Sequence, residues 1–264
     1  MRRVCVVVEA GDRPGRNPLV PPLREELAAS GVDLVAWDPT VGFPLPPHPP
    51  DADLYLLKGD HPLVLSAGGC LADVGAPCLN PFEATAAAAD KARTHARLAR
   101  AGLPVPDTWA VADAGHRPGP VDTWAARFVK PVWGAHGQDV TLVADGEGAP
   151  SGAGPWLVQA PVEGDGYDMK IYGVGDRTAV RRVRTAPGVV DMPREPVADA
   201  DPSLARLAVA AAEACGLVCF GADFVLGPAG PVLVDLNAFP GYRGVAEGPV
   251  WVASAVLRNL RDGR

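Results

Sequence analysis

Three oxygen-bearing side chains are expected to converge near the C-terminal end of the chain. Asp223 lies in the predicted strand FGADFVL, while Asp235 and Asn237 share one face of the next predicted strand, PVLVDLN. Pairing of the two strands as a hairpin would set Asp223 beside Asp235. Two buried carboxylates repel each other unless a cation lies between them, and oxygen ligands of this kind suit Mg²⁺. The alternative, that Asp235 and Asn237 only form the turn before a Pro-Gly pair, is disfavoured by the buried Val-Leu-Val run.

A lysine followed by glycines suggests a phosphate site in FVKPVWGAHGQDVTLV, residues 128–143. One predicted strand ends near Lys130, and a loop with Gly134, His136 and Gly137 leads to the next strand. The backbone N–H groups of such a loop and the lysine ammonium suit a phosphate. The P-loop pattern GxxxxGK[ST] is absent, so a plain glycine-rich hairpin remains the alternative. His136 is either a ligand-facing donor or a solvated side chain.

A third candidate segment is LVQAPVEGDGYDMK, which follows a buried strand. Main-chain groups around Val158, Gln159 and Ala160 could meet the edge of an adenine, and Glu163 could reach a ribose. An edge strand that is broken by proline explains the same segment equally well.

The elements that must carry these residues follow two patterns. In the first third, Val/Leu runs alternate with helical segments, which is typical of a parallel sheet with helices on its faces. Residues 81–102 are predicted to form one alanine-rich helix that ends at Gly102. From residue 108 onward strands dominate, with one helix over 203–216 and another near the C-terminus. Residues 186–202 are expected to form a mobile loop that orders on substrate binding.

Composition and charge disfavour several classes of protein. The chain has 264 residues, a net charge of −7 and no Lys/Arg run, so no nucleic-acid partner is expected. Five scattered cysteines form no zinc pattern, which predicts a reducing, cytoplasmic compartment. The N-terminal apolar run breaks at Glu9, too early for a signal peptide. No stretch reaches the roughly 20 apolar residues of a membrane span, so no membrane partner is expected.

The order of these motifs resembles the ATP-grasp superfamily from about Leu56 to the C-terminus. The segments that carry the resemblance are DK at 90–91, VKPVWGAHG, LVQ, YDMKIYGVG, FGADFVL and VDLNAFPGYRGV. Two groups within the superfamily look most similar. One is the ribosomal-protein glutamate ligases with related amino-acid ligases, and the other is the inositol polyphosphate kinases that share the fold.

The resemblance implies an α/β fold of three lobes, with α+β halves that clamp ATP. The lobes would span residues 1–80, 81–155 and 156–264. Lys91 and Lys130 would hold ATP phosphates, and residues 158–160 would line the adenine pocket. Asp223, Asp235 and Asn237 would hold Mg²⁺, for which Mn²⁺ is expected to substitute. Dimers are common among relatives, so a homodimer is one expectation.

Two departures from the ligase pattern favour the kinase group. Asp235 stands where the ligases usually have glutamate, and Lys170 stands where they commonly have arginine. For either chemistry, cationic side chains must stabilise the oxygens on which charge develops. Lys170 and Arg182 are the predicted catalytic residues, and Arg184 is a further candidate on the same strand.

The supply of cations at the predicted substrate side favours an amino-acid substrate. Gly241 and Arg243 follow the metal motif, and Arg243 could pair with a substrate carboxylate. Lys58 and His61, in LLKGDHP, and Arg184 are the other predicted substrate residues. These are few charges for an inositol polyphosphate, so we expect a ligase that joins small amino acids through an acyl phosphate. A polyol-phosphate kinase and a non-catalytic ATP-binding module are the alternatives.

Overall fold

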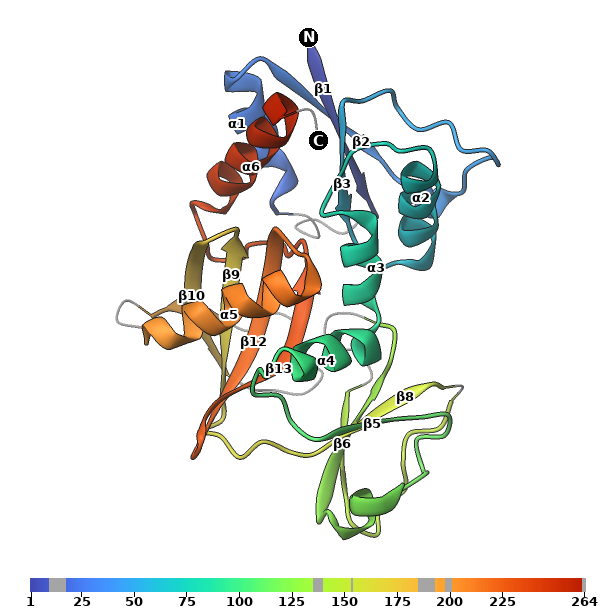
Figure 1. The fold of residues 1–264 in the computed structure, drawn as a ribbon, viewed down its shortest axis with the longest axis vertical. Helices are drawn as coiled ribbons and strands as arrows, with labels where there is room; N and C mark the ends of the chain where they lie inside the picture. Colours follow the sequence, from blue (N-terminus) through green and yellow to red (C-terminus); the bar gives the residue numbers. More distant parts are fainter. Residues whose placement is uncertain (10–17, 135–139, 153, 185–192, 198–200, 263–264) are drawn as a thin grey trace.

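The computed structural model describes residues 1–9, 18–134, 140–152, 154–184, 193–197 and 201–262. Its N-terminal sheet is parallel, as predicted, with the order β2-β1-β3-β4. Helices α1 and α2 pack on opposite faces of this sheet (Figure 1). The bounds are β1 Arg2–Val8, α1 Val20–Ala29, β2 Val32–Trp37, β3 Leu54–Lys58, α2 Pro62–Asp73 and β4 Cys78–Leu79, with a short 3-10 helix at Pro39–Val41.

The second sheet is antiparallel and has the order β5-β8-β6-β7. Strand β8 lies between β5 and β6, so its interpretation as an edge strand was wrong. The proline after it, Pro161, lies beyond the last paired residue and interrupts no ladder. The bounds are β5 Thr108–Val111, β6 Ala126–Pro131, β7 Thr141–Ala144 and β8 Trp156–Gln159, with a 3-10 helix at Gly119–Thr123.

The third sheet, with the order β11-β10-β9-β12-β13, is antiparallel, and helix α5 covers one of its faces (Figure 1). Strand β11 lies inside the segment predicted to be a loop, of which residues 186–192 and 198–200 are outside the described part. The bounds are β9 Tyr167–Val174, β10 Arg177–Arg184, β11 Arg194–Pro196, α5 Pro202–Cys215, β12 Cys219–Gly227 and β13 Gly230–Ala238.

The single helix predicted over residues 81–102 is two helices, α3 (Phe82–Ala89) and α4 (Lys91–Arg100). Asp90 separates them because it has an extended backbone, with φ −100° and ψ 102°. Its carboxylate caps α4 by accepting from the N–H groups of Ala92 and Arg93, each at 3.0 Å. The cap outweighs the helical propensity of the alanine run.

The packing crosses the lobe limits that the sequence predicts, and these limits stay a prediction. Helix α6 (Gly248–Asp262) returns to the N-terminal sheet and packs beside α1. The buried side chain of Asn80 joins the N-terminal lobe to the third sheet, because its amide donates to the carbonyl of Cys219 at 2.8 Å and accepts from the same residue's N–H. Helices α3 and α4 pack with α5.

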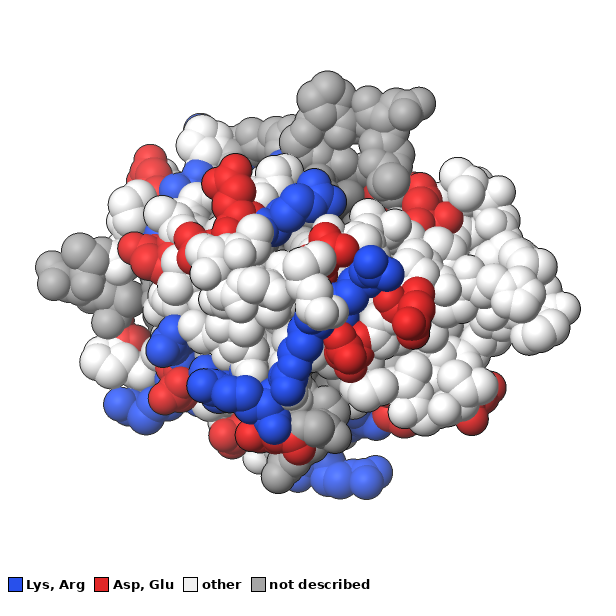
Figure 2. All heavy atoms as spheres, turned by 90° about the horizontal axis from the view of Figure 1, so that it is seen from above, with Lys and Arg blue, Asp and Glu red and all other residues white. Residues whose placement is uncertain are grey.

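Figure 2 shows one face of the molecule, on which a diagonal line of basic side chains is flanked by acidic ones. Within the described residues, none of the helices combines the length and the hydropathy that a membrane span requires.

Candidate functional site

The hairpin of β12 and β13 brings the two candidate carboxylates face to face. Asp223 pairs with Asp235, as predicted, whereas the next pair toward the turn is Phe224 with Leu233. Val234 is therefore an extra residue, a β-bulge. Without it, the turn register would pair Asp223 with Val234, and the two carboxylates would lie on opposite faces. Bulges next to active sites commonly re-aim a side chain in this way.

Lys170 compensates the first of these carboxylates. It lies opposite Asp223 on the neighbouring strand β9, and its amine forms an ion pair with that side chain. Burial raises the pKa of Asp223, and the charge of Asp235 acts in the same direction, against Lys170. Burial alone would lower the pKa of Lys170, but Asp223 outweighs it and raises the value. The expectation that only a divalent ion could compensate the pair was therefore too strong.

The second carboxylate has a more positive environment. Burial alone would raise the pKa of Asp235, but the charges of Lys91 and Lys130 outweigh it and hold the pKa below its usual value. The side-chain amide of Asn237 also donates to Asp235, at 3.1 Å. Lysines thus surround the acidic pair. Their charges favour the ionised form of Asp235, whereas burial disfavours the ionised form of Asp223.

The donor set fits a magnesium ion that is completed by other ligands. Among the described residues, no three His, Cys, Asp or Glu side chains gather as a metal site. Asp223 and Asp235 with the amide of Asn237 supply two carboxylates and a neutral oxygen. Mg²⁺ is commonly bound through one or two carboxylates, with waters and substrate phosphates filling the other positions.

Lys130 has a buried position that suits a phosphate contact. It is 8% exposed, and its amine donates to the side-chain oxygen of Gln159 at 2.9 Å and to the carbonyl of the bulge residue Val234 at 3.1 Å. Burial and the nearby charge of Lys91 lower the pKa of Lys130 against the charge of Asp235. Lys91 itself donates to the carbonyl of Gly134 at the start of the glycine loop.

The structure changes the interpretation of the predicted adenine segment. The backbone of Val158 and Gln159 pairs with both neighbouring strands, and the N–H of Ala160 donates to the carbonyl of Asp107 at 2.9 Å. Some of the main-chain groups that the prediction offered to an adenine edge, including the N–H of Ala160, are therefore hydrogen-bonded within the protein. The adenine contact of this segment stays a prediction. The side chain of Gln159 instead positions Lys130, a role that the sequence analysis missed. Glu163 is exposed beyond the strand.

Replacing Lys130 with methionine is expected to raise the KM for ATP on the order of ten- to hundredfold, because a desolvated cation–phosphate contact is lost. Gln159→Leu should raise it less, since that change leaves the ammonium in place but unsupported. Steady-state ADP release at varied ATP measures both effects. An unchanged KM in the Lys130 variant would remove this residue from the nucleotide site.

The candidate arginines on β10 do not share a face with the cluster. Lys170 pairs with Arg181, so Arg182 and Arg184 point to the opposite side of the sheet. The guanidinium of Arg182 lies 3.6 Å from the ring centroid of Tyr167 and is bonded to an exposed carboxylate on that side. Arg181 on β10 and Arg194 on β11 lie on the side of the cluster, and the sequence analysis missed both. The charge of Arg194 acts to lower the pKa of Asp223.

Lys58, His61, Gly241 and Arg243 lie near the junction between the N-terminal lobe and the third sheet, whereas Arg184, the remaining predicted substrate residue, ends β10. Lys58 ends β3 and donates to the carbonyl of Phe239 at 3.3 Å. His61 caps α2 by accepting from the N–H of a residue in its first turn, at 3.1 Å. Gly241 and Arg243 lie in the loop that follows β13. Two candidates of the glycine loop, His136 and Gly137, are outside the described residues.

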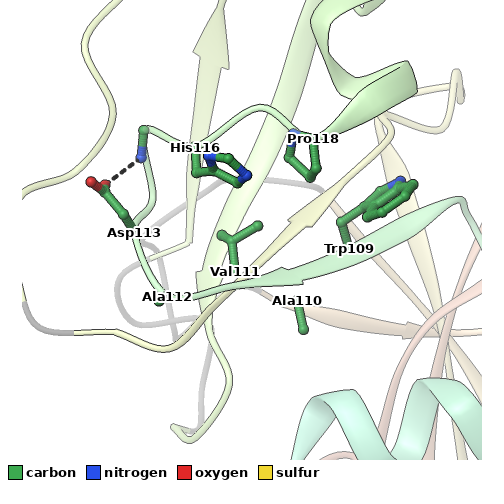
Figure 3. Close-up of a pocket in the computed structure, with 8 residues that line it drawn as sticks. Trp109, Ala110, Val111, Ala112, Asp113, His116 and Pro118 are labelled. Carbon is green, nitrogen blue, oxygen red and sulfur yellow. Dashed lines mark hydrogen bonds between the residues drawn. The ribbon is translucent and has the colours of Figure 1, made fainter.

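A separate pocket lies on the second sheet and takes no part in this cluster. It has a volume of about 790 Å³, and Trp109, His116 and Pro118 lie along it (Figure 3). The carboxylate of Asp113 accepts from a backbone N–H within the bounding loop, at 2.8 Å. The pocket contains none of the residues that the sequence assigns to ATP, metal or substrate.

Comparisons with known proteins point to one group. No protein-family model matches the chain. The chain is 30% identical over 205 residues to a probable alpha-L-glutamate ligase of Xanthomonas oryzae pv. oryzae, strain MAFF 311018, a match that covers 69% of this chain and 68% of that protein.

Solved structures are similar over nearly the whole chain. A RimK domain ATP-grasp protein of Sphaerobacter thermophilus DSM 20745 has a TM-score of 0.76 at 21% identity, with 96% of this chain and 98% of that chain covered. The ATP-grasp ligase PsnB in complex with a minimal precursor, Mg and ADP has a TM-score of 0.68 at 19% identity, and 98% of each chain is covered. These likenesses concern the fold alone.

Proposed function

Because this chain belongs to the ATP-grasp superfamily, with alpha-L-glutamate ligases among its relatives, we propose that it joins small amino acids through an amide bond. Its relationship to the alpha-L-glutamate ligases makes it an ATP-dependent ligase. The finer proposal is that a glutamate-type acid is the donor and an amino-acid amine the acceptor, so that the product is a dipeptide. The relationship to the alpha-L-glutamate ligases supports this choice of donor. The observation that carries the ATP-dependent chemistry is the acidic pair of Asp223 and Asp235 amid three lysines.

The reaction that fits this cluster has two steps. A carboxylate oxygen of the donor attacks the γ-phosphorus of ATP, and the bond between that phosphorus and the bridging oxygen breaks to release ADP. The acceptor amine then attacks the acyl carbon, phosphate leaves, and the amine loses a proton. Neither step needs a covalent bond to the protein, so position and charge are its whole contribution.

The side chains of the cluster have matching roles in this proposal. Lys91 and Lys130 would bind the phosphates of ATP, and Lys170 would stabilise charge at the transferred phosphoryl group. Asp223, Asp235 and Asn237 would hold Mg²⁺, which when bound neutralises phosphate oxygens. Arg182 and Arg184 have no part in it because they lie on the far face.

The alternatives receive less support. The relationship to the glutamate ligases favours a ligase over a kinase of inositol phosphates. An assembled cluster of Lys130, Asp223 and Asp235 favours an enzyme over a non-catalytic ATP-binding module. Asp235 and Lys170 remain the two positions at which the sequence resembles the kinases.

The test is ADP release in the presence of MgATP, screened against amino acids singly and in pairs and then against inositol phosphates. We expect release that requires two amino acids together, with a dipeptide detected by mass spectrometry. Release with one polyol phosphate would establish the kinase instead. Absence of release with all of these compounds would contradict both proposals and favour the binding module.

A further inference from the structure

Lys58 is a buried lysine to which the chemistry at the cluster gives no role. The chain has only four lysines among its 24 cationic residues, and the other three are Lys91, Lys130 and Lys170. Lys91 donates to the glycine loop, Lys130 acts on Asp235 through its charge, and Lys170 forms an ion pair with Asp223. Lys58 is 9% exposed. Since desolvation of an ammonium is costly, its burial indicates a partner of opposite charge.

The position of Lys58 is one at which open α/β sheets bind ligands. It is the last residue of β3 and pairs with Val8, the last residue of β1. The helices after these two strands, α1 and α2, pack on opposite faces of the sheet, so the winding of the chain reverses here. Ligands of such sheets bind outside the carboxyl ends of the strands at this reversal point.

A second cation approaches this position from the third sheet. Burial lowers the pKa of Lys58 to about 8, and the charge of Arg243 is the second largest cause of this shift. The charge of Asp60 acts in the opposite direction. The nearby thiol of Cys219 stays neutral, because burial raises its pKa to about 12. Two cations from different lobes therefore converge on one buried position. A carboxylate at Lys58 would offset the desolvation of this ammonium and the effect of the Arg243 charge on it.

The loop that carries Arg243 is held firmly. Phe239 and Tyr242 have left-handed backbones, with φ of 47° and 50°, which non-glycine residues adopt only where their surroundings fix them. Both rings are buried, and the hydroxyl of Tyr242 donates to a carbonyl of β9 at 2.8 Å. Arg181 donates to the carbonyl of Gly244 at 2.8 Å. Arg243 thus lies on a loop that is anchored on both sides.

We propose that Lys58 and Arg243 bind a carboxylate of the amino-acid substrate that is not activated by ATP, an inference that rests on the proposed ligase function. Lys58 donates to the carbonyl of Phe239, just after β13, and Asn237 lies two residues earlier within that strand. The Cα atoms of Phe239 and Asn237 are therefore at most about 7 Å apart. That span fits one free amino acid, with one carboxylate at Lys58 and its reacting group at the cluster. A substrate whose carboxylate is blocked would lose the contact.

The test compares the binding of L-glutamate and of L-isoglutamine, its α-carboxamide, by calorimetry in the presence of Mg²⁺ and a non-hydrolysable ATP analogue. The wild-type protein is expected to prefer L-glutamate by at least about tenfold, and Lys58→Met should remove that preference. The preference should also decline above pH 8 in the wild type, because the ammonium that binds the carboxylate then loses its proton.

Two further variants separate recognition from folding. Arg243→Gln should reduce the preference as well, whereas Arg177→Gln, at the exposed start of β10, should retain it. The thermal midpoint of Lys58→Met should equal or exceed that of the wild type, because a desolvated charge is removed. A wild-type protein without preference, or a Lys58→Met variant that keeps it, would overturn the proposal. Failure of the ligase function would show separately, as ADP release that no amino acid stimulates.

Discussion

Replacing Asp235 with asparagine is expected to lower kcat on the order of a thousandfold or more, because the phosphoryl group then loses a metal-mediated stabilisation of several kcal/mol. Asp235 is the carboxylate of the pair that its surroundings keep charged, since Lys91 and Lys130 hold its pKa below the usual value against burial. It is therefore the better ligand for a divalent ion. Asparagine has the same shape, so the change removes charge and little packing.

Two measurements check this prediction. Steady-state ADP release gives kcat, and nucleotide binding with and without Mg²⁺ shows whether affinity still depends on the ion. Asp176→Asn, at the exposed turn between β9 and β10, is the matched control and should retain full activity. Mn²⁺ should support turnover of the wild type but not of the variant. Mg²⁺-dependent turnover in Asp235→Asn would remove this residue from the metal site.

The hairpin turns in the sequence predict which residues of neighbouring strands pair, and therefore which side chains face the site. The strands β9 and β10 meet at Gly175-Asp176, a two-residue turn of the type that fixes register. Counting back from this turn pairs Lys170 with Arg181, as the structure has it. The same count places Arg182 on the other face. The choice of Arg182 as a catalytic residue was therefore avoidable from the sequence.

The bulge at Val234 was beyond such reasoning. The turn between β12 and β13 alone would pair Asp223 with Val234, and no local pattern announces an extra residue. The bulge depends on the sheet around it, and its carbonyl accepts from Lys130 on a strand of another sheet. The predicted pairing of Asp223 with Asp235 was correct, but it depends on the bulge at Val234, which could not be predicted from the sequence.

Contacts between lobes were also out of reach. Lys58 and Phe239 are separated by 181 positions, and only the packing of the N-terminal lobe against the third sheet joins them. The break between α3 and α4 differs, because Asp90 before Lys91 is a recognisable N-cap. Local polar signals could thus be read from the sequence, whereas register shifts and contacts between lobes needed the folded chain.

Replacing Lys170 with methionine is expected to lower the free energy of unfolding by about 2–3 kcal/mol in the absence of metal and nucleotide. The change leaves Asp223 largely buried beside Asp235 without its ion-pair partner. The side chains of Lys170 and Asp223 are 23% and 17% exposed, so solvent screening places the loss at the lower end of the range for buried pairs. Urea denaturation in the presence of EDTA measures the effect.

A double-mutant cycle and added metal distinguish two roles for this ion pair. Lys170→Met combined with Asp223→Asn should recover most of the lost stability, because no uncompensated charge remains. If Asp223 is a metal ligand, Mg²⁺ with an ATP analogue should stabilise Lys170→Met more than it stabilises the wild type, since the ion then supplies the missing charge. Equal stabilisation of both proteins would mean that Asp223 is not a metal ligand. Asp235 and Asn237 would then hold the ion while Asp223 remains the ion-pair partner of Lys170.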